Sequence, residues 1–109
     1  MKVKTSELFG KALDWAVAKC DGISDQPLHS YNPSTDWSQG GPIIEREKLS
    51  VGTRHTNGEI YWDADVLCWA RNSNGGFLKY GSTPLIAAMR CYVASKIGDE
   101  VEIPEELIK

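Results

Sequence analysis

The sequence predicts an α+β fold: a small antiparallel sheet of about three strands covered by helices, in an α-β-α sandwich-like arrangement. Two stretches with helical spacing lie toward the two ends of the chain, and shorter runs of alternating apolar residues lie between them. The absence of an alternating strand-helix-strand unit argues against a doubly wound parallel sheet. The length of 109 residues suits one domain spanning residues 1–109.

The first predicted helix runs from Thr5 or Ser6 to about Cys20. Its apolar residues recur at a spacing of three and four, which puts them on one helical face. These residues are Leu8, Phe9, Ala12, Leu13, Ala16, Val17 and Cys20. We expect a hydroxyl of Thr5 or Ser6 to cap the start of the helix, and Gly22 follows its end.

Residues 21–35 are rich in Gly, Pro, Ser, Asn and Asp, a composition that predicts a connecting loop. At the end of this loop, Ser34, Thr35 and Asp36 carry side-chain oxygens that accept hydrogen bonds from the free amides of a helix start. We therefore expect a second helix from this point to about Lys48.

Gly40, Gly41 and Pro42 oppose a regular second helix, since a helix interior disfavours glycine by about 1 kcal/mol and proline by about 3 kcal/mol. Two alternatives remain open: the helix starts late with Pro42 in its first turn, or it is kinked. Glycines at these positions would also let another backbone approach closely.

After Lys48 the apolar spacing shifts toward two, which predicts an antiparallel meander of about three strands. The runs are LSVGTR at 49–54, GEIYWDADV at 58–66 and LCWAR at 67–71. Asn57-Gly58, between the first two runs, is a strong hairpin signal. NSNGG at 72–76 then predicts a loop before FLKYG.

The last predicted helix begins with a cap from Ser82 or Thr83 and a first-turn proline, Pro84, and it ends near Gly98. Pro104 then opens a final single turn. We expect the acidic stretch 99–106 to be a solvated end of the chain.

Charge and composition exclude several classes of function. Twelve Lys and Arg stand against fifteen Asp and Glu, and the net charge of −3 argues against binding of long nucleic acid. No apolar run is long enough to cross a membrane, and the three cysteines form no CxxC pair. These cysteines, Cys20, Cys68 and Cys91, are expected to be reduced thiols in a cytoplasm, most of them packed as small hydrophobes.

A catalytic set is not visible in the sequence. His29 and His55 stand at no fixed spacing from a Ser, Cys or carboxylate partner. Asp63 and Asp65 would share one strand face, where a solvated pair is a simpler interpretation than a metal or acid-base site. We therefore expect no enzyme activity, no metal and no cofactor.

Aromatic residues and helix starts instead favour a binding site for a small molecule. Trp and Tyr rings stack on a nucleobase, Arg pairs with phosphate, and the amides of a helix start hold an anion. The residues that we expect to contact such a ligand are Ser34, Thr35, Trp37, Arg46, Arg54, Trp62, Trp69, Ser82, Thr83 and Arg90.

Three blocks of the sequence resemble a known family: KALDWAVAKCDG at 11–22, YNPSTDWSQGGPIIERE at 31–47 and TPLIAAMRCYVASKIGDEVEIPEEL at 83–107. Together they are similar to the NinX-like family of small bacteriophage and prophage proteins. The resemblance implies an accessory protein in the cytoplasm of an infected bacterium. It does not imply any enzymatic reaction. More distantly, the layout is similar to phage α-β-α sandwich domains.

Two functional hypotheses follow. The first is a non-enzymatic binder of a small nucleotide-like ligand, which would act as an anti-defence sponge for a bacterial immune signalling nucleotide; the sponge role is an analogy to the phage way of life. The alternative is a protein-protein interaction module that binds and modulates a host or phage protein. Edge strands of a small sheet also favour self-association into a homo-oligomer.

Overall fold

A computed structural model describes residues 1–22, 31–54, 67–71, 78–81 and 83–107 of the chain. Its elements are, in order, β1 (Lys2–Lys4), the 3-10 helix η1 (Thr5–Glu7), α1 (Gly10–Cys20), α2 (Trp37–Glu47), β2 (Ser50–Arg54), β3 (Leu67–Arg71), β4 (Leu78–Gly81), α3 (Pro84–Lys96), β5 (Glu100–Glu102) and the 3-10 helix η2 (Glu105–Leu107). The predicted hairpin turn Asn57-Gly58 and the predicted strand 58–66 lie outside the described residues.

The helix α1 begins at Gly10, later than the sequence predicts. Thr5 does not cap it, because the Thr5 backbone N–H donates to the Asp99 carbonyl at 2.7 Å and the Thr5 hydroxyl donates to the Gly98 carbonyl at 2.6 Å. These bonds hold Thr5 in η1, and Phe9 in extended conformation then precedes a Gly10 with φ of +57°. A positive φ of this kind favours glycine. The predicted end is confirmed, since α1 stops at Cys20.

The helix α2 begins at Trp37, so the predicted alternative of a late start at Pro42 is wrong. Asp36 caps it: its carboxylate accepts from the Ser38 N–H at 2.9 Å. Pro42 lies inside the helix. At the other end, Lys48 adopts a left-handed conformation with φ of 55°, which ends the helix.

The strands β2, β3 and β4 form a three-stranded antiparallel sheet in that order, as the sequence predicts in number and direction. Its third strand comes from the FLKYG run, which the sequence analysis places after the meander. Ala70 of β3 pairs with Val51 and Lys79, and it is fully buried.

A second, two-stranded sheet joins the two ends of the chain, which the sequence analysis does not predict. In the antiparallel pair of β1 and β5, Val3 lies opposite Val101, and Val101 is buried. The Met1 ammonium also donates to the Glu102 carboxylate at 3.1 Å. The expectation that residues 99–106 form a solvated end holds for the acidic side chains of Asp99, Glu100, Glu102 and Glu105, which are exposed. It is wrong for Val101 and Ile103 between them, which are buried.

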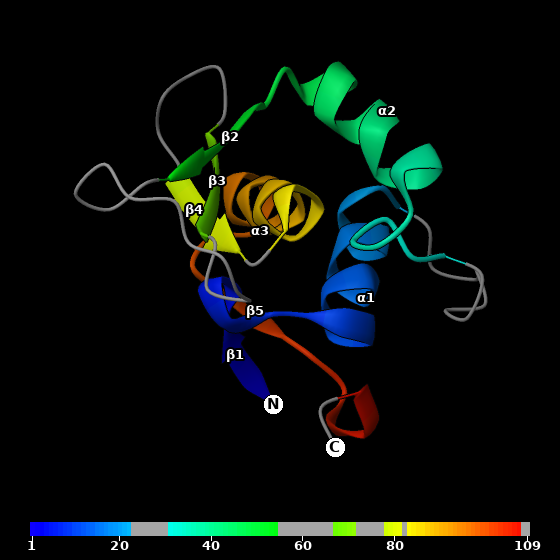
Figure 1. Ribbon diagram of the computed structural model, residues 1–109. Helices are drawn as coiled ribbons and strands as arrows, with labels where there is room; N and C mark the ends of the chain where they lie inside the picture. The colour runs from blue at the N-terminus through cyan, green and yellow to red at the C-terminus, as the bar shows by residue number, and fades with distance from the viewer. Residues whose placement is uncertain (23–30, 55–66, 72–77, 82, 108–109) are drawn as a thin grey trace.

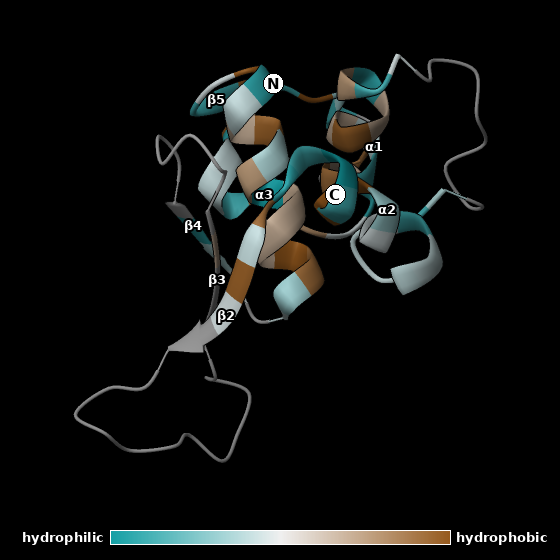
Figure 2. Ribbon diagram, turned by 90° about the horizontal axis from the view of Figure 1, so that it is seen from above, coloured by the Kyte–Doolittle hydropathy of each residue, from teal (hydrophilic) through white to brown (hydrophobic). Residues whose placement is uncertain are grey.

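The helix α3 lies at the centre of the molecule, between the three-stranded sheet on one side and α1 and α2 on the other (Figure 1). Seen from above, the three helices again lie on one side of that sheet (Figure 2). The helix α3 is accordingly buried along most of its length, at Leu85, Ala87, Ala88, Met89, Cys91, Tyr92, Val93 and Ala94. The predicted α+β class is confirmed, with layers in the order sheet, α3, then α1 and α2. The α-β-α order of layers is not seen among the described elements, because all three helices lie on one side of the three-stranded sheet.

Candidate functional site

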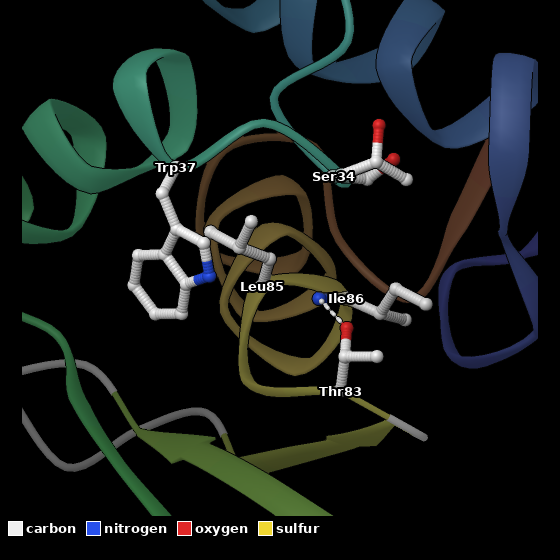
Figure 3. Close-up of a pocket in the computed structure, with 6 residues that line it drawn as sticks. Ser34, Trp37, Thr83, Leu85 and Ile86 are labelled. Carbon is white, nitrogen blue, oxygen red and sulfur yellow. Dashed lines mark hydrogen bonds between the residues drawn. The ribbon is translucent and has the colours of Figure 1, made fainter.

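A pocket of about 200 Å³ lies where the starts of α2 and α3 meet. We call it the Trp37 pocket, and its lining residues are Ser34, Thr35, Trp37, Thr83, Leu85 and Ile86. Figure 3 shows the Trp37 indole on one side of it, Ser34 and Ile86 on the other, and Leu85 between them. Four of these six residues belong to the binding set that the sequence predicts.

Trp37 supplies the largest side chain of the pocket. It is the first residue of α2 and is 57% exposed, which is unusual for a tryptophan. A half-exposed indole beside a concave surface offers a flat apolar face, and such faces stack on planar ligands.

The two helix starts that border the Trp37 pocket are capped by their own side chains. Asp36 accepts hydrogen bonds from both the amide and the hydroxyl of Ser38, and these bonds lower the pKa of Asp36. At the start of α3 the Thr83 hydroxyl accepts from the Ile86 N–H at 3.1 Å, while Pro84 has no N–H. Few amides are therefore left for an anion.

Ser34 ties the wall of the pocket to α1. Its backbone N–H donates to the buried Asp14 carboxylate at 2.9 Å. Burial raises the pKa of Asp14, while Ser34, through its nearby hydroxyl and this amide bond, acts in the opposite direction. The Ser34 hydroxyl is itself buried and, within the described part of the chain, makes no hydrogen bond of regular geometry.

Arg46 does not lie at the Trp37 pocket. It is nine residues after Trp37 on the same helix, roughly 14 Å farther along the axis. There its guanidinium bonds to the carboxylates of Asp21 and Glu47, each at 2.9 Å, and to the Tyr92 hydroxyl at 3.0 Å.

A polar network surrounds this arginine, and its centre is Asp21, which the sequence analysis does not single out. The Asp21 carboxylate accepts from Arg46 and from the hydroxyls of Tyr31 and Tyr92. Burial, followed by the effects of Asp21, raises the pKa of both tyrosines above the usual range. The network joins the ends of α1 and α2 to α3, so its role is to brace the helices.

Arg90 also has a structural role. Its guanidinium donates to the Leu8 carbonyl at 2.6 Å and to the Tyr80 carbonyl at 2.8 Å, and burial lowers the pKa of Arg90. It thereby links α3 to β4 and to the segment before α1.

The structure thus brings Ser34, Thr35, Trp37 and Thr83 together and leaves Arg46 and Arg90 elsewhere. Of Arg54 and Trp69 only the backbone is described, in β2 and β3, where Trp69 pairs with Gly52 and Tyr80. Trp62 and Ser82 lie outside the described residues. Leu85 and Ile86 complete the pocket, and neither belongs to the binding set that the sequence predicts.

A larger apolar groove, of about 480 Å³, lies at the start of α1. We call it the Phe9 groove, and its lining residues are Val3, Glu7, Leu8, Phe9, Gly10, Lys11, Ala12 and Leu107. Phe9 is 69% exposed there. None of its residues belongs to the predicted binding set.

The described residues give little support for a metal site or a cysteine nucleophile. No three His, Cys, Asp or Glu side chains gather among them as a metal site requires. Burial raises the pKa of the Cys20 thiol to about 11, which is unfavourable for a nucleophile. None of the described helices is long and apolar enough to span a membrane.

Fold and site together define an α+β protein with a small pocket between two helix starts and no titratable side chain in the pocket lining. The family model described as Bacteriophage P22, NinX matches residues 23–96, more than half of the sequence. The chain therefore belongs to this bacteriophage family, as its sequence resemblance implies. The matched segment includes all six residues of the Trp37 pocket. Comparison with curated proteins finds no match.

Proposed function

We propose that this phage protein is a non-enzymatic binder of a small nucleotide-like ligand and that the ligand occupies the Trp37 pocket. The exposed indole of Trp37 beside a concave surface carries the proposal. In this role the protein would sequester a signalling nucleotide of the infected bacterium and so counter a host defence.

The size of the pocket limits what it holds. Sites for drug-sized ligands have volumes of roughly 300–1,000 Å³, whereas the Trp37 pocket has about 200 Å³. This volume suits one heteroaromatic ring system better than a whole nucleotide. Stacking on an indole contributes about 1–3 kcal/mol per base, and a dissociation constant of 1 mM already requires about 4 kcal/mol. Hydrogen bonds from the pocket hydroxyls must therefore add to the stacking.

The chemistry of the pocket lining supports binding over turnover. Its polar groups are the hydroxyls of Ser34, Thr35 and Thr83, and its other side chains are apolar or aromatic. A hydroxyl nucleophile needs an adjacent base that titrates in a useful range, and none of the six lining residues supplies one.

Thermal unfolding in the presence of mono-, di- and cyclic nucleotides tests the proposal. A ligand at a hundredfold excess over its dissociation constant stabilises the folded chain by about 2.7 kcal/mol. We expect Trp37→Ala to abolish this stabilisation. The matched control is Phe9→Ala, which removes another exposed aromatic side chain away from the pocket and should leave the stabilisation unchanged. A nucleotide response that survives Trp37→Ala contradicts the assignment of the site.

The Phe9 groove favours a second candidate function, the interaction module. Exposed aromatic side chains beside apolar grooves are common anchors of protein interfaces, and Phe9 meets this description. Under this alternative, a copurified host or phage protein is lost in Phe9→Ala and retained in Trp37→Ala. Native mass spectrometry of the same preparations reports the number of subunits and any retained small molecule.

A further inference from the structure

We infer that the Trp37 pocket recognises an uncharged, planar heteroaromatic base and that any phosphates of the ligand lie outside the pocket. This inference rests on the proposed function and makes it more specific. Three features of the described residues carry it: the charge around the pocket, the state of the two helix starts, and the hydrogen-bonding capacity of the pocket hydroxyls.

The charge around the pocket is unfavourable for phosphate. None of the six lining residues is cationic. Two of the three arginines expected to pair with phosphate are engaged elsewhere, Arg46 with Asp21 and Glu47, and Arg90 with backbone carbonyls. The side chain of the third, Arg54, lies outside the described part of the chain. Asp36 stands next to the lining residues Thr35 and Trp37, so a negative charge borders the pocket.

The helix starts do not compensate for this charge. The positive end of a helix dipole is equivalent to roughly half an elementary charge. At the start of α2 the full negative charge of Asp36 exceeds it, and Asp36 already accepts from the Ser38 amide. At the start of α3, Pro84 has no N–H and the Ile86 N–H is bonded to Thr83. A phosphate would therefore find few free donors and a net repulsion at the first helix.

The pocket also offers a hydrogen-bond donor to the edge of a base. Thr83 accepts from the Ile86 N–H, and its own O–H remains available as a donor. The Ser34 hydroxyl is buried and acts on the Asp14 carboxylate, so it is not exposed to a ligand. The Thr35 hydroxyl is already bonded to Asn32. Thr83 thus offers a donor to a ring nitrogen or carbonyl oxygen of a base stacked on Trp37.

A matched ligand series tests the inference by isothermal titration calorimetry: adenosine, guanosine, cytidine and uridine, each beside its 5′-monophosphate and 5′-triphosphate, with inorganic phosphate as a further probe. We expect at least one nucleoside to bind as tightly as its phosphorylated forms or more tightly, and inorganic phosphate not to bind. Trp37→Ala should abolish binding of that nucleoside.

The variant Asp36→Asn provides a sharper comparison, because asparagine caps a helix as well as aspartate and removes the charge. It should tighten the binding of the monophosphate by about two- to fivefold and leave the nucleoside affinity unchanged. Thermal unfolding of the variant shows whether the fold is retained. An equal effect on nucleoside and nucleotide overturns the inference.

The remaining outcomes separate the inference from the proposed function. Phosphorylated forms that bind about tenfold tighter than their nucleosides, in a Trp37-dependent way, overturn the inference and leave the proposed function standing. Failure of every nucleoside and nucleotide to bind overturns both, and so does binding that is independent of Trp37.

Discussion

Gly40 lies so close to Pro33 that a Cβ atom at Gly40 would stand 2.4 Å from the Pro33 carbonyl oxygen. The same Cβ would lie 2.7 Å from a methyl group of Leu85, a residue of the Trp37 pocket. Because Gly40 has no side chain, α2 can pack closely on the segment that precedes it and on α3. The glycine, which is costly for helix formation, is therefore required for packing.

Gly40→Ala should destabilise the fold by about 2 kcal/mol, because the added methyl group meets a backbone carbonyl that cannot move freely. It should also disturb the pocket, since Leu85 must shift. Chemical denaturation measures the free energy of unfolding. The matched control is Gly41→Ala, whose Cβ would meet its nearest neighbour, the Trp37 ring, at 4.0 Å. That variant should gain about 0.5–1 kcal/mol from helix propensity. Equal effects of the two substitutions would contradict the close approach.

Thr83→Ala should cost about 1 kcal/mol by removing the cap of α3. The loss corresponds to a fall in Tm of roughly 5 °C for a domain of this size. Thr83→Ser retains the hydroxyl that accepts from the Ile86 N–H and should restore most of the stability. A Tm that is the same for the alanine and serine variants would show that the cap is not used.

Asp14→Asn should become more stable relative to the native chain as the pH rises. The carboxyl titrates near 3.8 in the unfolded chain and at a higher value in the fold, because burial raises its pKa. Its contribution to folding is thus present below pH 3.8 and is lost as the pH rises through the raised value. Asparagine stays uncharged, and its amide oxygen can accept from the Ser34 N–H.

Denaturation of both chains between about pH 3 and about pH 7 measures this difference in stability. Asp36→Asn is a control of opposite sign: hydrogen bonds lower the pKa of Asp36, so its charged form supports folding above pH 3.8. That variant should lose stability relative to the native chain as the pH rises. Parallel curves for the native chain and Asp14→Asn would disprove the burial of an ionisable group at this position.

Arg90→Met should destabilise the fold by about 2 kcal/mol, since it leaves the carbonyls of Leu8 and Tyr80 without their charged donor. Methionine keeps an unbranched apolar stem and removes the guanidinium group. The affinity for any ligand of the Trp37 pocket should not change, which calorimetry at a temperature well below Tm can establish. If the variant is stable but loses affinity for the ligand, Arg90 contributes to binding after all.

The helices were the most predictable part of the fold. Apolar spacing and capping residues predict a last helix from Ser82 or Thr83 to near Gly98, close to the observed α3 at Pro84–Lys96, and they give the end of α1. The start of α1 was missed because the Thr5 hydroxyl, a good local cap, bonds to Gly98 at the far end of the sequence. The local sequence pattern cannot predict a hydrogen-bond partner that lies 93 residues away in the chain.

The candidate site was predictable in part. Ser34, Thr35, Trp37 and Thr83 are predictable because capping residues and an aromatic residue at a helix start are visible in the local sequence. Arg46 was expected beside them and lies at the other end of α2, where Asp21 and Tyr92 bind it. The residue type indicates an anionic partner, and only the packing of three helices decides which anion it meets.

The sequence by itself determined the α+β class, the order of the helices and the antiparallel sheet, because periodicity, capping and turn chemistry act over a few residues. The family followed separately, from the resemblance of three sequence blocks to its members. Tertiary structure alone decided that β1 pairs with β5, that all three helices pack on one side of the sheet, and that two helix starts enclose a pocket. These arrangements bring together residues far apart in the chain. They form only where the burial of apolar surface exceeds the entropy lost in closing the intervening segments.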